Sequence, residues 1–159
     1  MKLTTSDVDL IEIVRAVARS IAQADGITIV KRIGEETDYL AEDAIGPLWA
    51  GLQFPIDKCL AGRAMTEEHT VVIPDITQTE NIPLNVYLGT FIRSLVAVPI
   101  GGGRPTHAIC AYWQVAGPIP PETITLMEAL AVAMGNAFER MAALGIADGD
   151  HAKARHQSG

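Results

Sequence analysis

The strongest constraint on the fold comes from two apolar runs separated by three consecutive glycines. Residues 94–100 (SLVAVPI) and 106–115 (THAICAYWQV) are rich in β-branched and aromatic side chains, which favour strands. The intervening residues Gly101–Gly103 permit the positive φ angles of a tight turn. The pattern therefore predicts an antiparallel hairpin, because parallel strands would need a much longer crossover connection.

Hydrophobic periodicity predicts the remaining elements. Long helices are expected at the two ends of the chain, over residues 6–23 and 121–143, because apolar side chains recur there at helical spacing. Ser6 and Asp57 are the N-caps expected for the first helix and for a short internal one. Between the ends, the pattern predicts a strand over 27–33, its hairpin partner over 37–42, an extended piece over 52–56, the short helix over 58–68 and a strand over 71–73. Because hairpin-like connections dominate, we expect an α+β fold with an antiparallel sheet.

The chain has 159 residues, which is the size of one ordinary domain. We expect that domain to span residues 6–146, after an extension over 1–5 and before a polar, disordered tail over 147–159. Residues 75–93 contain Pro83 and Gly89 and lack one clear period. This segment is long for a passive connection, so it is either a short-helix excursion or a functional lid.

Composition excludes several classes of protein. The chain carries 12 basic and 19 acidic residues, a net charge of −7, which argues against a nucleic-acid partner. No apolar run approaches the roughly 18 residues that predict a membrane span, and the N-terminal stretch lacks a signal-peptide core. Cys59 and Cys110 are too few for a disulfide framework or a four-cysteine zinc site. We therefore expect a cytoplasmic protein with reduced thiols.

Six segments in one order resemble a known family. They are ADGITIVKR (24–32), EDAIGPLWAG (42–51), FPIDKCLAGRAM (54–65), VVIPDI (71–76), NIPLNVYLGTFIRSLVAVPI (81–100) and HAICAYW (107–113), and the terminal helix matches as well. Over residues 24–142 the chain resembles the GAF domain family, especially the GAF domains of bacterial two-component sensor histidine kinases.

The resemblance implies a GAF-like, PAS-related fold. Its six-stranded antiparallel sheet would carry the terminal helices on one face. The short helix and residues 75–93 would cover a small-molecule cavity on the other face. GAF domains bind ligands such as cyclic nucleotides, bilins, haem or small metabolites, or serve only as dimerising relays. Because the chain has no matching kinase or phosphodiesterase region, it would be a free-standing sensor or an excised domain, with a histidine kinase or another signalling protein as partner.

Enzymatic and cofactor chemistry is not expected from the cysteines. One GAF-fold family, the free methionine-(R)-sulfoxide reductases, uses cysteines that line this cavity. Here Ala61 occupies the place before Gly62 where the resemblance requires a cysteine, and residues 75–93 contain none. Covalent bilin attachment would require a cysteine followed by histidine near residues 88–95, and that pair is absent. We therefore expect no catalysis and no covalent bilin.

The histidines do not predict a metal site either. His69, His107, His151 and His156 lack the spacing of metal ligands, and two of them lie in the tail. His107 alternates with Ile109 along one strand face, which favours a partly buried histidine with one hydrogen-bond partner over a ligand contact. No cofactor is therefore expected.

Ligand contact is expected mainly from residues 75–93. The candidates combine aromatic surface with a few directional polar groups, as small-molecule sites usually do. They are Asp75, Asn81, Tyr87, Phe91, Arg93 and, from the strand across the sheet, Tyr112. In the alternative interpretation the aromatic side chains simply fill the space, and Asp75 and Arg93 tie the segment to the sheet through a charge-assisted hydrogen bond.

Apolar side chains left over on the terminal helices predict a homodimer. Ile124, Ala129, Ala133 and Ala143 widen the stripe of the last helix beyond what one sheet needs. With Ile13 or Val17 they could form a bundle with a second copy. Alternatively, residues 6–23 cover this stripe within one chain. The function expected is a non-catalytic sensory module in bacterial signal transduction, whose cavity ligand orders residues 75–93 and shifts the helix pairing. The alternative is a dimerising relay without a ligand.

Overall fold

The computed structural model describes residues 2–156 and the side chains of residues 7–145. Six strands form one antiparallel sheet in the order β3-β2-β1-β6-β5-β4. The strands are β1 (Gly26–Ile33), β2 (Glu36–Ala44), β3 (Gln53–Pro55), β4 (Val71–Ile73), β5 (Ser94–Ile100) and β6 (His107–Trp113). The helices are α1 (Lys2–Ala22), α2 (Leu60–Glu67), α3 (Leu84–Leu88) and α4 (Pro121–His156), and a 3₁₀ turn, η1 (Ile56–Lys58), precedes α2. The predicted α+β fold is confirmed.

The β5–β6 hairpin forms as its sequence predicts. Gly101 and Gly103 have φ angles of 110° and 74°, a conformation that glycine adopts without strain. The central strands β1 and β6 pair over six residues, and β6 pairs with β5 over its whole length. At one end of the sheet this register places Ile100, His107 and Lys31 side by side on three neighbouring strands.

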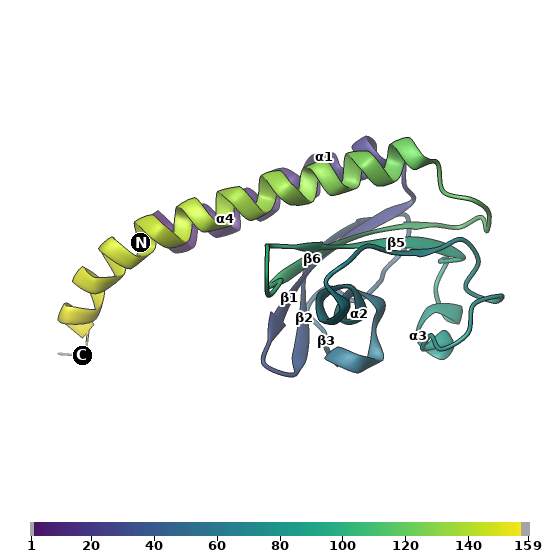
Figure 1. The fold of residues 1–159 in the computed structure, drawn as a ribbon, viewed down its shortest axis with the longest axis horizontal. Coiled ribbons are helices and arrows are strands. Elements are labelled where there is room, and N and C mark those ends of the chain that lie inside the picture. Colours follow the sequence, from purple (N-terminus) through teal and green to yellow (C-terminus); the bar gives the residue numbers. More distant parts are fainter. Residues whose placement is uncertain (1, 157–159) are drawn as a thin grey trace.

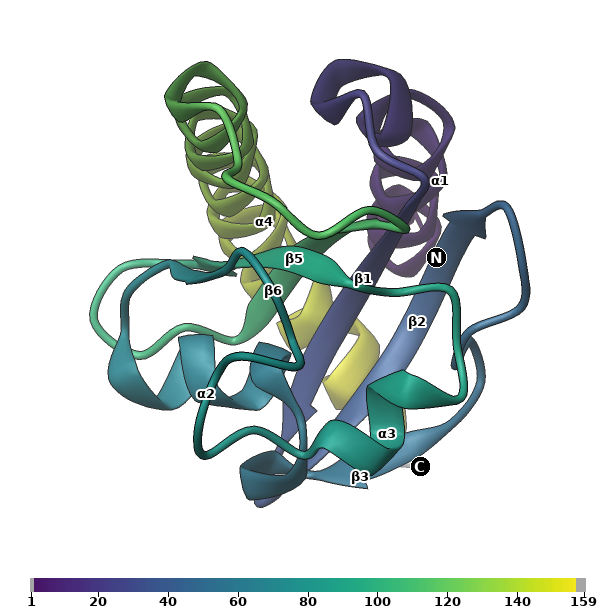
Figure 2. The ribbon, with the colours of Figure 1, turned by 90° about the vertical axis from the view of Figure 1, so that its right-hand side faces the viewer.

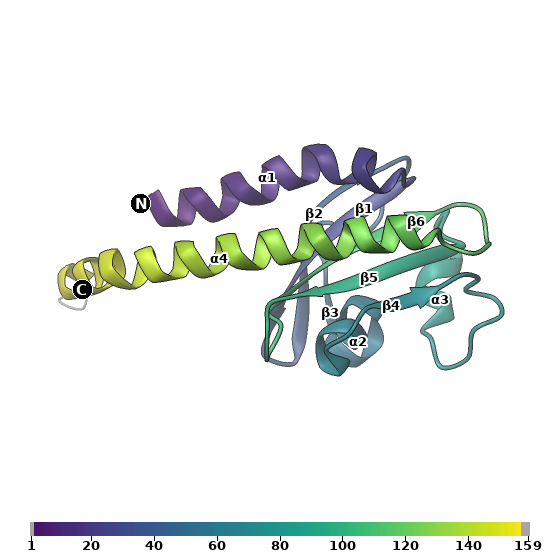
Figure 3. The ribbon, with the colours of Figure 1, turned by 45° about the horizontal axis from the view of Figure 1, so that its top comes forward.

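Two apolar layers cover the two faces of the sheet. α1 and α4 lie together over one face, while α2, α3 and the loops around them lie over the other (Figures 1, 2 and 3). Side chains alternate between the layers: Ile27, Ile29 and Ile109 pack under the terminal helices, whereas Val30 and Cys110 face the opposite layer. Because the central strands are covered on both faces, the first five residues of β1 and the first six of β6 are buried.

The terminal helices are longer than the sequence pattern predicted. α1 begins at Lys2, so Ser6 lies inside it rather than at its N-cap, and no glycine or proline before Ser6 would stop the helix. α4 continues through residues 147–156, where we expected a disordered tail, since alanine and basic residues there favour helix. Residues 157–159 of that predicted tail lie outside the described part of the chain.

α4 also reaches far beyond the sheet. Its 36 residues correspond to about 54 Å of helix, whereas β5 and β6 have seven residues each, about 24 Å of strand. Figure 1 shows α4 running alongside α1 and continuing past the end of the sheet. The two helices contact each other along this course, so the terminal segments form a paired rod attached to the sheet.

Candidate functional site

The face opposite the terminal helices is filled by aromatic rings. Trp49 lies at the centre of the group, with edge-on contacts to Tyr39, Phe54, Tyr87 and Tyr112 at ring-centroid distances of 5.4–6.2 Å. Edge-to-face packing is a favoured arrangement of aromatic side chains. We call these five residues the ring cluster; it occupies the space in which the sequence predicted a small-molecule cavity.

A carboxylate positions Trp49. The loop from Gly46 to Leu52 carries no regular strand or helix, yet the Glu42 side chain accepts hydrogen bonds from the backbone N–H groups of residues 48, 49 and 50 at 2.8–2.9 Å. An ionised carboxylate binds such donors strongly. Glu42 therefore fixes the loop that inserts the Trp49 indole among the other rings, a role that the sequence pattern did not reveal.

Hydrogen bonds satisfy two of the three phenols of the cluster, those of Tyr87 and Tyr112. The Tyr112 hydroxyl lies 2.7 Å from Thr28 Oγ1, and the Tyr87 hydroxyl accepts from the backbone N–H of Leu60 at 3.0 Å. Burial raises the pKa of Tyr87 and of Tyr112 well above the ordinary value. These phenols remain neutral at physiological pH, so none of them supplies an ionised group to this face.

Both cysteine thiols are buried and unpaired with each other, in surroundings that suit a structural role. Cys59, rather than the predicted Asp57, is the N-cap of α2: its Sγ accepts from the Gly62 N–H at 3.4 Å, because Asp57 lies in the preceding turn η1. Burial raises the pKa of the Cys110 thiol to about 12. A thiol with a raised pKa is a weak nucleophile at neutral pH.

The structure brings together only part of the predicted ligand set. Tyr87 and Tyr112 both contact Trp49 in the ring cluster. Phe91 is half-buried at the edge of the same layer, where it packs against Gly26. Asn81 lies further out with a φ of 61°, and its carbonyl accepts a hydrogen bond from the Arg63 guanidinium.

The expected hydrogen bond between Asp75 and Arg93 is wrong. The Asp75 carboxylate accepts from the N–H and hydroxyl of Thr77 at 2.9 and 2.7 Å, and these bonds lower the pKa of Asp75. The Arg93 guanidinium donates instead to the carbonyls of Thr90 and Ile92. Main-chain bonds join the segment to the sheet, since the Arg93 N–H donates to the carbonyl of Trp113 in β6 at 2.8 Å, and the Ile76 N–H donates to the Arg93 carbonyl at 3.0 Å.

A pocket of about 480 Å³ lies on the same side of the sheet, outside the ring cluster. It lies between the N-terminal part of α2 and the segment before α3, and its lining includes Cys59, Arg63, Asn81 and Pro83. Of the six predicted ligand residues, this pocket contains Asn81 alone.

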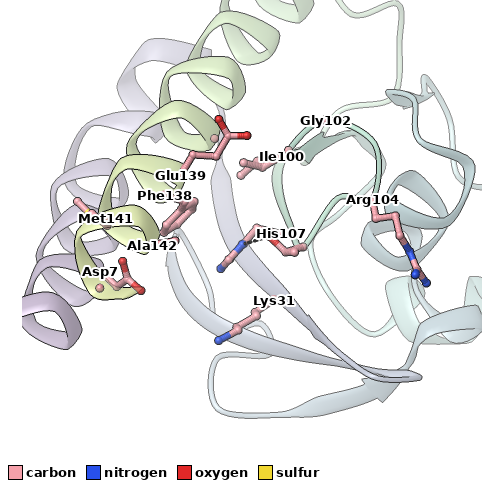
Figure 4. A pocket seen from close by; sticks show the side chains of 14 residues that line it. Asp7, Lys31, Ile100, Gly102, Arg104, His107, Phe138, Glu139, Met141 and Ala142 are labelled. Atoms are coloured by element: carbon pink, nitrogen blue, oxygen red, sulfur yellow. Dashed lines mark hydrogen bonds between the residues drawn. The ribbon is translucent and has the colours of Figure 1, made fainter. Parts of the chain in front are cut away.

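A second hollow, of about 620 Å³, lies on the helix face at the end of the sheet (Figure 4). Its floor is the His107 ring stacked on Phe138, with centroids 4.3 Å apart and planes 11° from parallel. The Thr106 hydroxyl lies 2.8 Å from His107 Nδ1, so the prediction of a partly buried histidine with one partner is confirmed. Burial, with the nearby Lys31 charge, lowers the pKa of His107 to about 4. Sequence analysis missed this hollow because residues 31, 107 and 138 meet only in the folded chain.

Within the part of the chain that the structure describes, no group of three or more His, Cys, Asp or Glu side chains could hold a metal ion. None of the described helices is long and apolar enough to cross a membrane.

No protein-family model matches the sequence, and no curated protein matches it. Solved structures match its fold. They include free methionine-R-sulfoxide reductase from Neisseria meningitidis in complex with its substrate (17% identity, 87% of this chain and 81% of that chain, TM-score 0.73). They also include the phycoerythrobilin-bound GAF domain of a cyanobacterial phytochrome (15% identity, 88% and 89%, TM-score 0.74) and the GAF-B domain of DevS from Mycobacterium smegmatis (14% identity, 87% and 96%, TM-score 0.71).

These likenesses establish that the chain has the fold of GAF domains, as the sequence resemblance predicted. Because the sequence identities are only 14–17%, these likenesses establish the fold and nothing about the function. The same fold serves a reductase and a bilin-bound photoreceptor domain among these proteins, so the function of this chain must be argued from its own side chains.

Proposed function

We propose that this chain is a non-catalytic regulatory GAF module that dimerises through α1 and α4 and relays a signal along these helices. The observation that carries the proposal is the ring cluster. A face already packed with the chain's own aromatic side chains favours a relay over a sensor whose ligand occupies that face.

Exposed apolar side chains on the paired helices support dimerisation. On α1 they lie four residues apart and share one face: Ile13, Val17 and Ile21. On α4 the exposed positions Leu126, Ala129, Ala133 and Leu144 also fall on one side of the helix. Surface helices normally turn charged or polar residues to solvent. A second copy that covers these stripes is the occupant we propose, because twofold pairing is the commonest symmetric assembly.

The part of α4 that extends beyond the sheet could transmit a change in helix pairing. Beyond the sheet the rod consists of helices alone, so a change in how two copies pair would reach its far end. A helical partner such as a bacterial histidine kinase would receive the signal there, which extends the resemblance to kinase-associated GAF domains. Any such shift is limited by the effector's differential affinity for the two pairings.

Light scattering on a sizing column tests the dimer. We expect a dimer for the unaltered chain and a monomer for Val17→Glu, because a charge buried in the interface would lack a partner. Val115→Glu is the matched control, since Val115 is exposed in the loop before α4. A monomeric parent chain, or a Val17→Glu variant that stays dimeric, would overturn the proposal.

The non-catalytic part is tested with the reaction of the matched reductase. Free methionine-(R)-sulfoxide is supplied with a thiol reductant to the parent chain and to Cys59→Ser. We expect the same background rate for both, since the Cys59 thiol is buried and caps α2. Turnover that disappears with Cys59→Ser would make the chain an enzyme.

A further inference from the structure

The hollow on the helix face combines features that a small-molecule site requires and that the ring cluster lacks. Its volume of about 620 Å³ lies within the range of small-molecule sites. The β5, β6 and β1 strands supply Ile100, His107 and Lys31 as adjacent positions, and α4 closes the space with Phe138. It lies on the opposite side of the sheet from the ring cluster.

The floor of the hollow is flat and uncharged. His107 and Phe138 present their stacked rings, and Ile100, Met141 and Ala142 add aliphatic surface. Because burial holds the pKa of His107 near 4, the imidazole is neutral at pH 7. The Thr106 hydroxyl occupies Nδ1, which leaves Nε2 as the ring nitrogen available to a ligand. An apolar group would be buried against this floor.

Charged side chains of both signs surround the hollow, and Figure 4 shows the Arg104 guanidinium pointing away from it. Lys31 and Arg104 come from the sheet and its β5–β6 loop, whereas Asp7 and Glu139 come from α1 and α4 (Figure 4). All four side chains are exposed. Among the side chains of residues 7–145, none of the four takes part in a salt bridge. The hollow thus offers basic and acidic side chains around an apolar floor.

We propose that this hollow binds a small zwitterion with an apolar side chain, of the amino-acid class. Its carboxylate would lie toward Lys31 on the sheet side, its ammonium group toward the carboxylates that α1 and α4 supply, and its side chain along the Phe138 ring. A ligand with only a negative charge would leave the Asp7 and Glu139 carboxylates without a partner. A ligand with only a positive charge would leave Lys31 without one. Such a ligand would bridge the sheet and α4. Its effect on signalling therefore rests on the proposed relay, although its binding does not.

Two amino acids and two analogues with a single charge show whether binding in the hollow needs both the carboxylate and the ammonium group. L-phenylalanine and L-leucine are titrated into the full chain by amide NMR and calorimetry, beside 3-phenylpropionate, which lacks the ammonium group, and phenethylamine, which lacks the carboxylate. We expect shifts at residues 31, 107 and 138, with L-phenylalanine at least about tenfold tighter than either single-charge analogue. Equal affinity for 3-phenylpropionate, no binding at millimolar concentrations, or shifts confined to the ring cluster would each overturn the assignment.

Paired variants test the basic and acidic side chains around the hollow. Lys31→Gln and Glu139→Gln should each weaken L-phenylalanine binding about tenfold, because each removes one charge-assisted contact. Lys58→Gln and Glu122→Gln, at exposed positions outside the hollow, are the matched controls and should bind like the parent. Undiminished binding in either Lys31→Gln or Glu139→Gln contradicts the proposal. Light scattering on the same samples reports the dimer separately, so failure of the ligand site and failure of the relay are distinguished.

Discussion

Replacing Trp49 with alanine tests whether the ring cluster is a structural core. The indole is 7% exposed and has four aromatic neighbours within 6.2 Å, so its removal leaves a large void under the loop. Truncation of a buried Trp costs about 3–5 kcal/mol, and aromatic pairs contribute roughly 0.5–1.5 kcal/mol each beyond burial. Because these terms overlap, we expect a loss of about 4 kcal/mol. For a domain of this size that corresponds to a fall in Tm of roughly 8–16 °C.

Urea unfolding followed by far-UV circular dichroism measures the change in the free energy of unfolding. Indole is then added to the Trp49→Ala variant, where it should occupy the vacated space and restore part of the lost stability by mass action. Trp113→Ala is the control: its indole N–H donates to the Gln23 carbonyl at 2.9 Å and lies on the helix face, so indole should not rescue it. A loss below about 1 kcal/mol in Trp49→Ala would refute the argument that this face is tightly filled.

Three further outcomes are expected from urea unfolding. Gly62→Ala should cost more than about 2 kcal/mol, because a Cβ there would overlap the Ile56 carbonyl oxygen; near-parent stability would contradict the close approach. Glu42→Gln should cost about 1–2 kcal/mol, because the glutamine amide keeps one acceptor oxygen and places a donor NH2 against an N–H group of residues 48–50; an unchanged midpoint would argue against this role. Burial lowers the pKa of His107 from 6.5 to about 4, so the unfolded chain binds the proton first as the pH falls. Stability should therefore decrease from pH 6.5 to 4, and His107→Gln should reduce that loss; an identical pH profile would refute it.

Much of the fold could be predicted because its signals are local. Alternation along β6 placed His107 and Ile109 on one face and Tyr112 on the other, as the structure has them. The glycines after β5 predicted the hairpin, and they adopt the expected positive φ angles. The ends of the helices were predicted less well, since neither the start of α1 nor the end of α4 carries a strong stop signal.

The candidate sites depended on contacts that no local pattern encodes. The alternative interpretation had Asp75 and Arg93 form a charge-assisted hydrogen bond, yet each side chain bonds to neighbours within three residues along the chain. Trp49 comes from a loop without regular structure, which the Glu42 carboxylate and main-chain bonds to Tyr39 hold in place. The sequence suggested that aromatic residues could fill the predicted cavity, but it did not identify Trp49 as the central ring.

By itself the sequence determined the order of the strands and terminal helices, the antiparallel connections and the faces on which the residues of β6 lie. These follow from short-range sterics and from the period at which apolar side chains recur, which act within a few residues. Only the tertiary structure decided that rings fill one face and that Lys31, His107 and Phe138 enclose a hollow on the other. Those arrangements join residues far apart in the chain, and their geometry depends on how loops and helices pack once the sheet has formed.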